Sequence, residues 1–368
     1  MMDFYSGTGA APDGEKEVKS PILTDAVFAA QTSPDKYRLV GMDDDDDQAG
    51  ERVVRAINTA LALQMPLLVS GEPGSGKTQL GYAIAHELGK PAPMKFVTKS
   101  ISTAQDLFYT YDAVRHFQVT QTLSETEAAS ENVTDVRNFL DLAPLGLAIL
   151  LALPLDQRRA FLPPGFETVE PANPQQAERL EKLKNPEPRQ SVVIIDEIDK
   201  APRDFPNDLL HEMENLRFRV PELGGLETPA IESGLQPIIV ITTNSERQLP
   251  DAFLRRCAYV HIEYPRGKAL ESILASRLAG VFEASAPFLA DAQKFYEDLR
   301  AKQIIDKPPG TAELLQFMQA MAANGVDHTQ PIAAQVELVQ QGVALLGKIK
   351  TDQERILTAL ADWAKTAN

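Results

Sequence analysis

Three short runs of apolar residues stand out along the chain, at 66–69, 192–195 and 238–241. Apolar positions at helical spacing lead into the first run, from 53 to 63, and further helical segments separate the runs from one another. Near-continuous apolar strands that alternate with helices are typical of a parallel sheet covered by helices on both faces. The pattern therefore predicts an α/β fold.

The pattern changes near residue 266, where apolar strands cease and helical spacing takes over. This spacing recurs in five segments, at 270–278, 288–299, 312–321, 333–346 and 356–363. We expect an acidic, flexible arm at 1–50, an α/β nucleotide-binding core at 51–265, and a helical lid with carboxyl-terminal helices at 266–368. Since about 120 residues separate the first two apolar runs, the core should carry an insertion at about 100–190.

Composition and charge limit the partners and the cellular location that we expect. Acidic residues outnumber basic ones by 52 to 36, and the resulting charge of −16 opposes unspecific binding to nucleic acid. The single cysteine, Cys257, cannot form an intramolecular disulfide, which fits a reducing compartment. With no apolar stretch near the roughly 20 residues that span a bilayer, and no signal-peptide pattern, we expect a cytoplasmic protein.

The first apolar run leads into a glycine-rich segment with the spacing of a phosphate-binding loop. It reads Gly71-Glu72-Pro73-Gly74-Ser75-Gly76-Lys77-Thr78, and a helix is expected from Gln79 onward. Glycines let the backbone N–H groups point into one concavity, where the helix amino terminus adds positive charge. We expect Lys77 to pair with the β- and γ-phosphates of a nucleotide and Thr78 to place its hydroxyl on Mg²⁺.

The second and third runs also stop at polar residues. Asp196 and Glu197 follow one run, and Asn244 lies beyond the other. Ligands of open parallel sheets bind beyond the carboxyl ends of the strands, so one site could collect all three clusters. There Asp196 is a candidate Mg²⁺ ligand, Glu197 a candidate base that polarises water, and Asn244 a hydrogen-bond donor to the water or the γ-phosphate.

Two further segments leave alternatives open. The adjacent Arg255 and Arg256 either cap a helix or supply a cation to the nucleotide of a neighbouring subunit. Three aromatic residues in 106–112 belong either to the core or to a partner contact. Strand-like residues on both sides of Gly224-Gly225 predict a hairpin before the third apolar run.

The motifs GEPGSGKT, VVIIDEIDKAP, ITTN, LPDAFLRRC and KPPGTAEL resemble those of the AAA+ ATPases, and within them the MoxR-like branch. The resemblance covers roughly residues 37–330. It implies these roles: Walker A for Lys77 and Thr78, Walker B for Asp196 and Glu197, sensor 1 for Asn244, and arginine finger for Arg256, with Arg255 as the second candidate. One departure concerns sensor 2, an arginine at the start of the third lid helix. Thr311 stands there, and Lys307 is a candidate substitute.

The resemblance also implies a function. ATP and Mg²⁺ would bind between the subunits of a ring, usually a hexamer, and hydrolysis would remodel or regulate a protein client, for which a von Willebrand A domain protein is the suggested candidate. A nucleotide-gated signalling scaffold with little turnover is the first alternative. A nucleic-acid motor is the second, and the net charge disfavours it.

Overall fold

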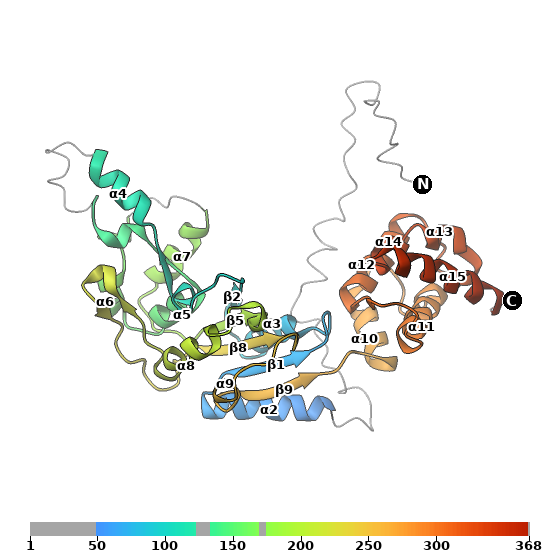
Figure 1. The fold of residues 1–368 in the computed structure, drawn as a ribbon, viewed down its shortest axis with the longest axis horizontal. Helices are drawn as coiled ribbons and strands as arrows, with labels where there is room; N and C mark the ends of the chain where they lie inside the picture. The colour runs from blue at the N-terminus through green and yellow to red at the C-terminus, as the bar shows by residue number, and fades with distance from the viewer. Residues whose placement is uncertain (1–48, 123–132, 169–173, 367–368) are drawn as a thin grey trace, which may run out of the picture. The chain divides into compact units, whose positions relative to one another are not determined.

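The computed structural model describes residues 49–122, 133–168 and 174–366. Within them the chain forms two compact units (Figure 1). One unit contains Arg52–Gly71 and Leu80–His261, and the other combines the loop Glu72–Gln79 with the chain from Ile262 onward. The predicted acidic arm lies almost entirely outside the described residues, so its character stays a prediction.

The first unit is built on a five-stranded sheet with the order β2-β5-β8-β1-β9. Its strands are β1 (Leu67–Gly71), β2 (Met94–Val97), β5 (Val192–Asp196), β8 (Ile238–Thr243) and β9 (Ala258–Ile262). The pairs β2 with β5, β5 with β8, and β1 with β8 are parallel. Since β1, β5 and nearly all of β8 are buried, the apolar runs form the centre of the sheet. The predicted α/β fold is confirmed.

Several helices belong to this unit. They include α2 (Ala49–Leu63), α3 (Lys77–Glu87), α5 (Pro144–Leu151), α8 (Phe205–Asn215) and α9 (Asp251–Leu254). Helix α3 approaches β5 at Gly81, where an added Cβ would lie 2.6 Å from Cδ1 of Ile194. Helix α5 is apolar all round and buried from Leu145 to Leu151, as expected of a helix in the middle of a core.

The segment between β2 and β5 contains a two-stranded antiparallel sheet and several short helices. Its elements are η2 (Ala104–Leu107), β3 (Tyr109–Tyr111), α4 (Ala113–Thr122), η3 (Val136–Phe139), β4 (Leu140–Leu142), α6 (Leu155–Arg158), η4 (Arg159–Phe161) and α7 (Pro174–Lys184). Phe108 stacks on Phe218 at 5.4 Å, and the buried Tyr109 donates a hydrogen bond to Glu222. These two aromatic residues therefore belong to the core.

A short hairpin follows helix α8 in the chain. The predicted hairpin is confirmed by β6 (Arg219–Val220) and β7 (Leu226–Glu227), which follow η5 (Ile198–Lys200) and enclose η6 (Pro221–Leu223).

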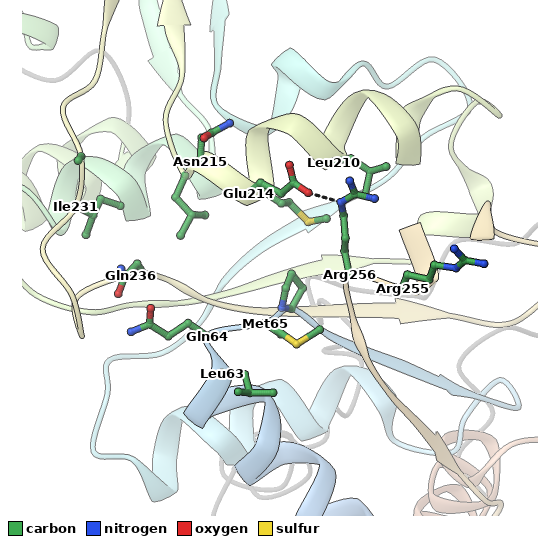
Figure 2. Close-up of a pocket in the computed structure, with 14 residues that line it drawn as sticks. Leu63, Gln64, Met65, Leu210, Glu214, Asn215, Ile231, Gln236, Arg255 and Arg256 are labelled. Atoms are coloured by element: carbon green, nitrogen blue, oxygen red, sulfur yellow. Dashed lines mark hydrogen bonds and ion pairs between the residues drawn. The ribbon is translucent and has the colours of Figure 1, made fainter. Parts of the chain in front are cut away.

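A pocket of about 440 Å³ is lined by residues at the carboxyl ends of α2 and α8 (Figure 2). Its apolar lining includes Leu63, Met65, Leu210, Met213, Leu216 and Ile231, and its polar lining includes Arg255 and Arg256.

The second unit is helical after Ile262 and has its own apolar core. Its helices are α10 (Gly267–Arg277), α11 (Pro287–Ala301), α12 (Thr311–Ala323), η7 (Ile332–Gln335), α13 (Val336–Gln340), α14 (Val343–Leu346) and α15 (Lys350–Thr366). The expectation of one helix over 333–346 is wrong, because α13 ends at Gln340 and a separate helix, α14, begins after Gly342. An added Cβ there would lie 2.6 to 2.7 Å from Met321 and Phe317, so the backbone passes directly over α12.

Candidate nucleotide site

The glycine-rich loop connects the end of β1 to the start of α3. Gly74 and Gly76 have φ angles of +79° and +93°, in the region that favours glycine. Lys77 begins the helix and its Nζ donates a hydrogen bond to the carbonyl of Glu72 at 2.8 Å. The lysine thus folds back over its own loop, and its expected pairing with the β- and γ-phosphates stays a prediction.

Polar groups in this loop fit the oxygens of phosphate. The Oγ of Ser75 and the Oε1 of Gln79 are buried and have no hydrogen-bond partner among the described residues. Helix α3 begins at Lys77, directly after the loop, so the positive end of its dipole lies beside these groups. A helix amino terminus next to an unpaired serine hydroxyl favours an anionic ligand.

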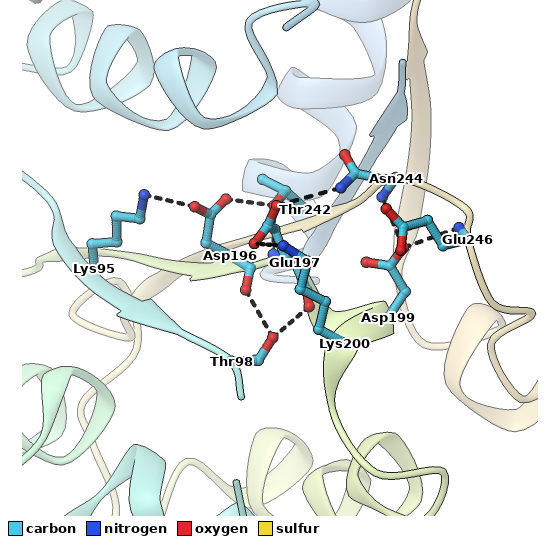
Figure 3. A network of polar contacts seen from close by, with 9 residues as sticks. All are labelled: Lys95, Thr98, Asp196, Glu197, Asp199, Lys200, Thr242, Asn244 and Glu246. Carbon is cyan, nitrogen blue, oxygen red and sulfur yellow. Dashed lines mark hydrogen bonds and ion pairs between the residues drawn. The ribbon is translucent and has the colours of Figure 1, made fainter. Parts of the chain in front are cut away.

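Asp196 ends β5 and is held by groups on both neighbouring strands (Figure 3). Thr242 of β8 donates its hydroxyl to Oδ1 of Asp196 at 2.6 Å, and Lys95 of β2 forms an ion pair with Oδ2 at 2.6 Å. The backbone N–H of Glu197 donates to the same threonine hydroxyl at 2.9 Å. The carboxylate of Asp196 is therefore fixed at the tip of the sheet.

Glu197 has an unusual backbone conformation for a residue other than glycine. Its φ and ψ angles are 58° and 52°, in the left-handed region. Oε2 of its carboxylate pairs with Lys200 at 2.6 Å, and Asn244 lies 3.4 Å from Oε1. Thr98 of the chain after β2 contacts the carbonyls of Asp196 and Glu197 and supports the turn. Strain of this kind is commonly found at functional sites.

Asp199 is a part of this cluster that the sequence pattern did not predict. The residue is 4% exposed, and its Oδ2 accepts hydrogen bonds from the backbone N–H groups of Asn244 at 3.1 Å and Glu246 at 3.0 Å. Its Oδ1 has no partner among the described residues. Asp199 thus holds the segment after β8, and with it Asn244, next to Glu197. The sequence feature that could have indicated Asp199 is its position, three residues after Asp196 and close to the end of the same apolar run.

Strand order brings three predicted clusters to one edge of the sheet. β8 pairs with β5 on one side and with β1 on the other, in the registers Ile195 to Ile241 and Ser70 to Thr243. Asp196 and Glu197 end β5, Asn244 follows β8, and the phosphate loop continues directly from β1. The carboxyl ends of β5, β8 and β1 therefore lie along one edge of the sheet, with acidic and amide groups at the ends of the first two and the first residue of the phosphate loop, Gly71, at the end of the third.

Comparison with known families agrees with this geometry. The family model of the ATPase family associated with various cellular activities (AAA) matches residues 67–266. The chain belongs to the AAA ATPases. Comparison with curated proteins gives no match.

Magnesium accompanies nucleotides in such ATPases, and the donors present suit it. Asp196 offers a carboxylate and Thr78 a hydroxyl, the oxygen ligands that Mg²⁺ prefers while it keeps several waters. Among the described residues, no group of three or more His, Cys, Asp or Glu residues could enclose a metal.

The two candidate finger arginines of this AAA ATPase lie on the surface after α9 (Figure 2). Arg256 pairs with Glu214 of α8 and donates to the carbonyl of Ala252 at 3.0 Å. Arg255 is also exposed and points in a different direction. Both guanidinium groups are therefore placed on a surface that another molecule can reach, and Arg256 is held in place by Glu214.

The two candidates for sensor 2 differ in their surroundings. Thr311 is the first residue of α12, and its hydroxyl donates to Tyr264 at 3.1 Å. Lys307 is exposed, and its backbone N–H donates to Asp352 at 3.0 Å.

Across the described residues, no helix of this AAA ATPase combines the length and the apolar character needed to cross a membrane.

Proposed function

We propose that this chain is a MoxR-like AAA+ ATPase that binds ATP with Mg²⁺ and hydrolyses it at the subunit boundaries of a ring, which we take to be a hexamer. In this proposal the cycle remodels or regulates a protein partner, and a von Willebrand A domain protein is the candidate that the sequence resemblance suggests. The single cysteine supports the reducing cytoplasm as its location, and the charge of −16 disfavours a nucleic-acid partner.

The network around Glu197 is the observation that carries this proposal. One carboxylate, Asp196, is fixed between strands, and the next, Glu197, turns through a left-handed residue to face Asn244 at 3.4 Å. The first arrangement suits a group that holds a metal ion. The second suits a group that accepts a proton from water, with an amide beside it to orient the water.

Each residue then has a separate task in hydrolysis. Lys77 and the amino terminus of α3 bind the phosphate oxygens, while Thr78 and Asp196 hold the metal. When bound, Mg²⁺ neutralises charge on the phosphates and so favours attack by water. Glu197 polarises that water, and Asn244 keeps it in line.

The first experiment measures nucleotide binding by calorimetry and phosphate release for the wild type, Glu197→Gln and Glu232→Gln. The exposed Glu232 lies outside the network and serves as the matched control. Glu197→Gln should keep its affinity for ATP and lose turnover by about 100-fold or more, the usual scale for a general base. Wild-type turnover by Glu197→Gln would contradict the role of base. Binding without turnover in the wild type would favour the signalling scaffold instead.

A second experiment tests the subunit boundary. Arg256→Ala should reduce phosphate release by about 100-fold and leave ATP affinity unchanged, because the finger acts on a neighbouring nucleotide. Arg255→Ala is the matched comparison, and the larger loss identifies the finger. Full turnover by both variants would remove the case for a cation supplied in trans. Affinity capture with Glu197→Gln, which should hold its partner, identifies the client.

A further inference from the structure

Arg300, near the end of α11, makes contacts that no motif predicted. Its side chain is only 12% exposed, and Nη1 donates to the carbonyl of Pro309 at 2.7 Å. Nη2 forms an ion pair with Glu72, the second residue of the phosphate loop. The guanidinium also lies 3.7 Å above the ring of Tyr264, a favourable stacking arrangement. One side chain thus contacts the phosphate loop, the segment before α12 and the chain after β9.

The surroundings fix Arg300 in this position. The hydroxyls of Tyr264 and Tyr296 are hydrogen-bonded to each other, and Tyr296 donates to the carbonyl of Pro309 at 2.6 Å. Burial raises the pKa of both tyrosines, so their hydroxyls stay protonated and remain available as donors. The carbonyl of Pro309 therefore accepts from both Tyr296 and Arg300, and the guanidinium has little freedom to turn away.

A backbone contact joins the same two segments independently. An added Cβ at Gly74 would lie 2.8 Å from Cα of Gly310, and one at Gly310 would lie 3.1 Å from Cα of Gly74. The phosphate loop and the residue before α12 are thus in direct backbone contact. Arg300 binds both Glu72 of the loop and Pro309, and Pro309 directly precedes Gly310. The side chain and the glycine contact therefore link the same two segments, the phosphate loop and the residues before α12.

Glu72 poses an electrostatic problem for a loop that binds phosphate. Its carboxylate is 54% exposed and belongs to the same loop as Ser75 and Lys77. A negative charge within about 10 Å of a polyphosphate repels it with little screening. The partner that neutralises this charge is Arg300, which reaches the loop from 228 residues away in the sequence.

We propose that Arg300 is a positioning residue for the nucleotide: it neutralises Glu72 and holds the phosphate loop against the start of α12. This role rests on the proposed function, because the ligand of the loop is taken to be the polyphosphate of ATP. Arg300 acts through Glu72, whereas a sensor 2 arginine at the position of Thr311 would act on the nucleotide itself. The two roles differ in what happens when Glu72 is also neutral.

The test is a double-mutant cycle read by equilibrium binding of a fluorescent ADP. Arg300→Met should weaken binding about tenfold, because the charge of Glu72 is then uncompensated. Glu72→Gln alone should change binding by less than about threefold. The double variant should return to within about threefold of the wild type, since the repelling charge is gone. A double variant as weak as Arg300→Met would overturn the proposal and favour direct contact of Arg300 with phosphate.

Lys302→Met is the matched control for charge. Lys302 lies just after α11, is 64% exposed and pairs only locally with Asp298, so its loss changes the net charge by the same amount. Its affinity for ADP should equal that of the wild type. A tenfold loss in this control would show that the effect of Arg300→Met is a general charge effect, which also overturns the proposal.

The same four proteins are compared without nucleotide, which separates this proposal from the proposed function. Urea unfolding should show that Arg300 and Glu72 are coupled by about threefold in the unfolding equilibrium constant, and Arg300→Lys should retain part of this coupling. If wild-type protein binds no ADP or ATP, the proposed function fails. Absence of coupling in the nucleotide-free cycle instead removes the connection that Arg300 is proposed to make.

Discussion

Two regions of the sheet unit hold buried charge in opposite ways. In the insertion, Arg158 is 0% exposed, and its guanidinium donates only to backbone carbonyls. These belong to Leu151, Leu153, Leu183, Asn185 and Glu187, at 2.6 to 3.4 Å. At the strand tips, Asp196 and Glu197 pair with lysine side chains that are one third to one half exposed.

This difference distinguishes a charged group that stabilises the fold from charged groups that are available to a ligand. Every N–H direction of Arg158 is used by chain segments that it ties together, so the group is fully satisfied and has no further ligand to take. The strand tips keep a left-handed Glu197 and an unpaired oxygen of Asp199, and their lysine partners can move. Saturated contacts therefore indicate stability, whereas strain and exchangeable pairs indicate a binding site.

The largest effect is expected for Arg158→Met, which tests the structural half of this comparison. Five carbonyls lose a hydrogen bond at once, although the carbonyl of Leu151 keeps the backbone N–H of Arg189 as a donor. Burial, together with nearby Arg189, already lowers the pKa of Arg158. The free energy of unfolding should fall by about 3 kcal/mol or more. Urea unfolding measures it. Arg159→Met is the matched control, because the neighbouring arginine is exposed and pairs only with Glu167.

The single cysteine follows α9, outside the insertion, and gives a second, smaller test of the apolar core to which both segments contribute. Cys257 is 8% exposed and belongs to the same apolar core as Leu151, and burial raises the pKa of its thiol from 9.0 to about 12. At pH 8 its alkylation should be at least about 100-fold slower than in the unfolded chain, since only the thiolate reacts. From pH 9 toward 12 the unfolded thiol ionises first, so this contribution to stability declines.

Alkylation also compares the variants. Arg158→Met should raise the rate at pH 8 in proportion to its unfolding constant, because modification then proceeds through opening of the core. Arg159→Met should leave the rate unchanged. Equal rates in Arg158→Met and the wild type would show that the arginine does not hold this core together.

The strand tips were predictable from sequence because each depends on a local pattern. An apolar run that stops at Asp196 or before Asn244 indicates both the strand and its end. The partners were not predictable in this way. Thr242 reaches Asp196 only because β5 and β8 pair in one particular register, with Ile195 opposite Ile241. A shift of the register by one residue would turn Thr242 to the other face.

Contacts between distant elements were beyond reach for a related reason. Arg300 lies in an ordinary amphipathic helix, and nothing in its neighbourhood in the sequence indicates Glu72 as its partner. Likewise, the spacing of 333–346 indicates one helix, and the break at Gly342 follows from the closeness of Phe317. Periodicity reports which face of a helix is apolar, but the element that covers it is decided by the tertiary fold.

A smaller effect is expected at Asp199, which tests whether the strand tips need fixed supports. Asp199→Ala leaves the backbone N–H groups of Asn244 and Glu246 without their acceptor. Stability should fall by about 2 kcal/mol, and turnover should fall about tenfold as Asn244 loses its position. Asp199→Asn keeps one acceptor oxygen and should recover most of both. Equal losses in the two variants would show that the charge itself is required.

The smallest effect is expected for Lys200→Met, which tests whether the pairs at the strand tips are exchangeable. The pair with Glu197 is about half exposed on the lysine side, and the hydrogen bond to Glu197 raises the pKa of Lys200 above its ordinary 10.5. Such pairs contribute about 1 kcal/mol or less, so phosphate release should change by no more than about fivefold at any pH from 6 to 9. Lys182→Met, which breaks a surface pair with Glu178, is the control. A loss of 30-fold or more would mean that Lys200 is as fixed as Arg158, and the contrast between the two regions would then fail.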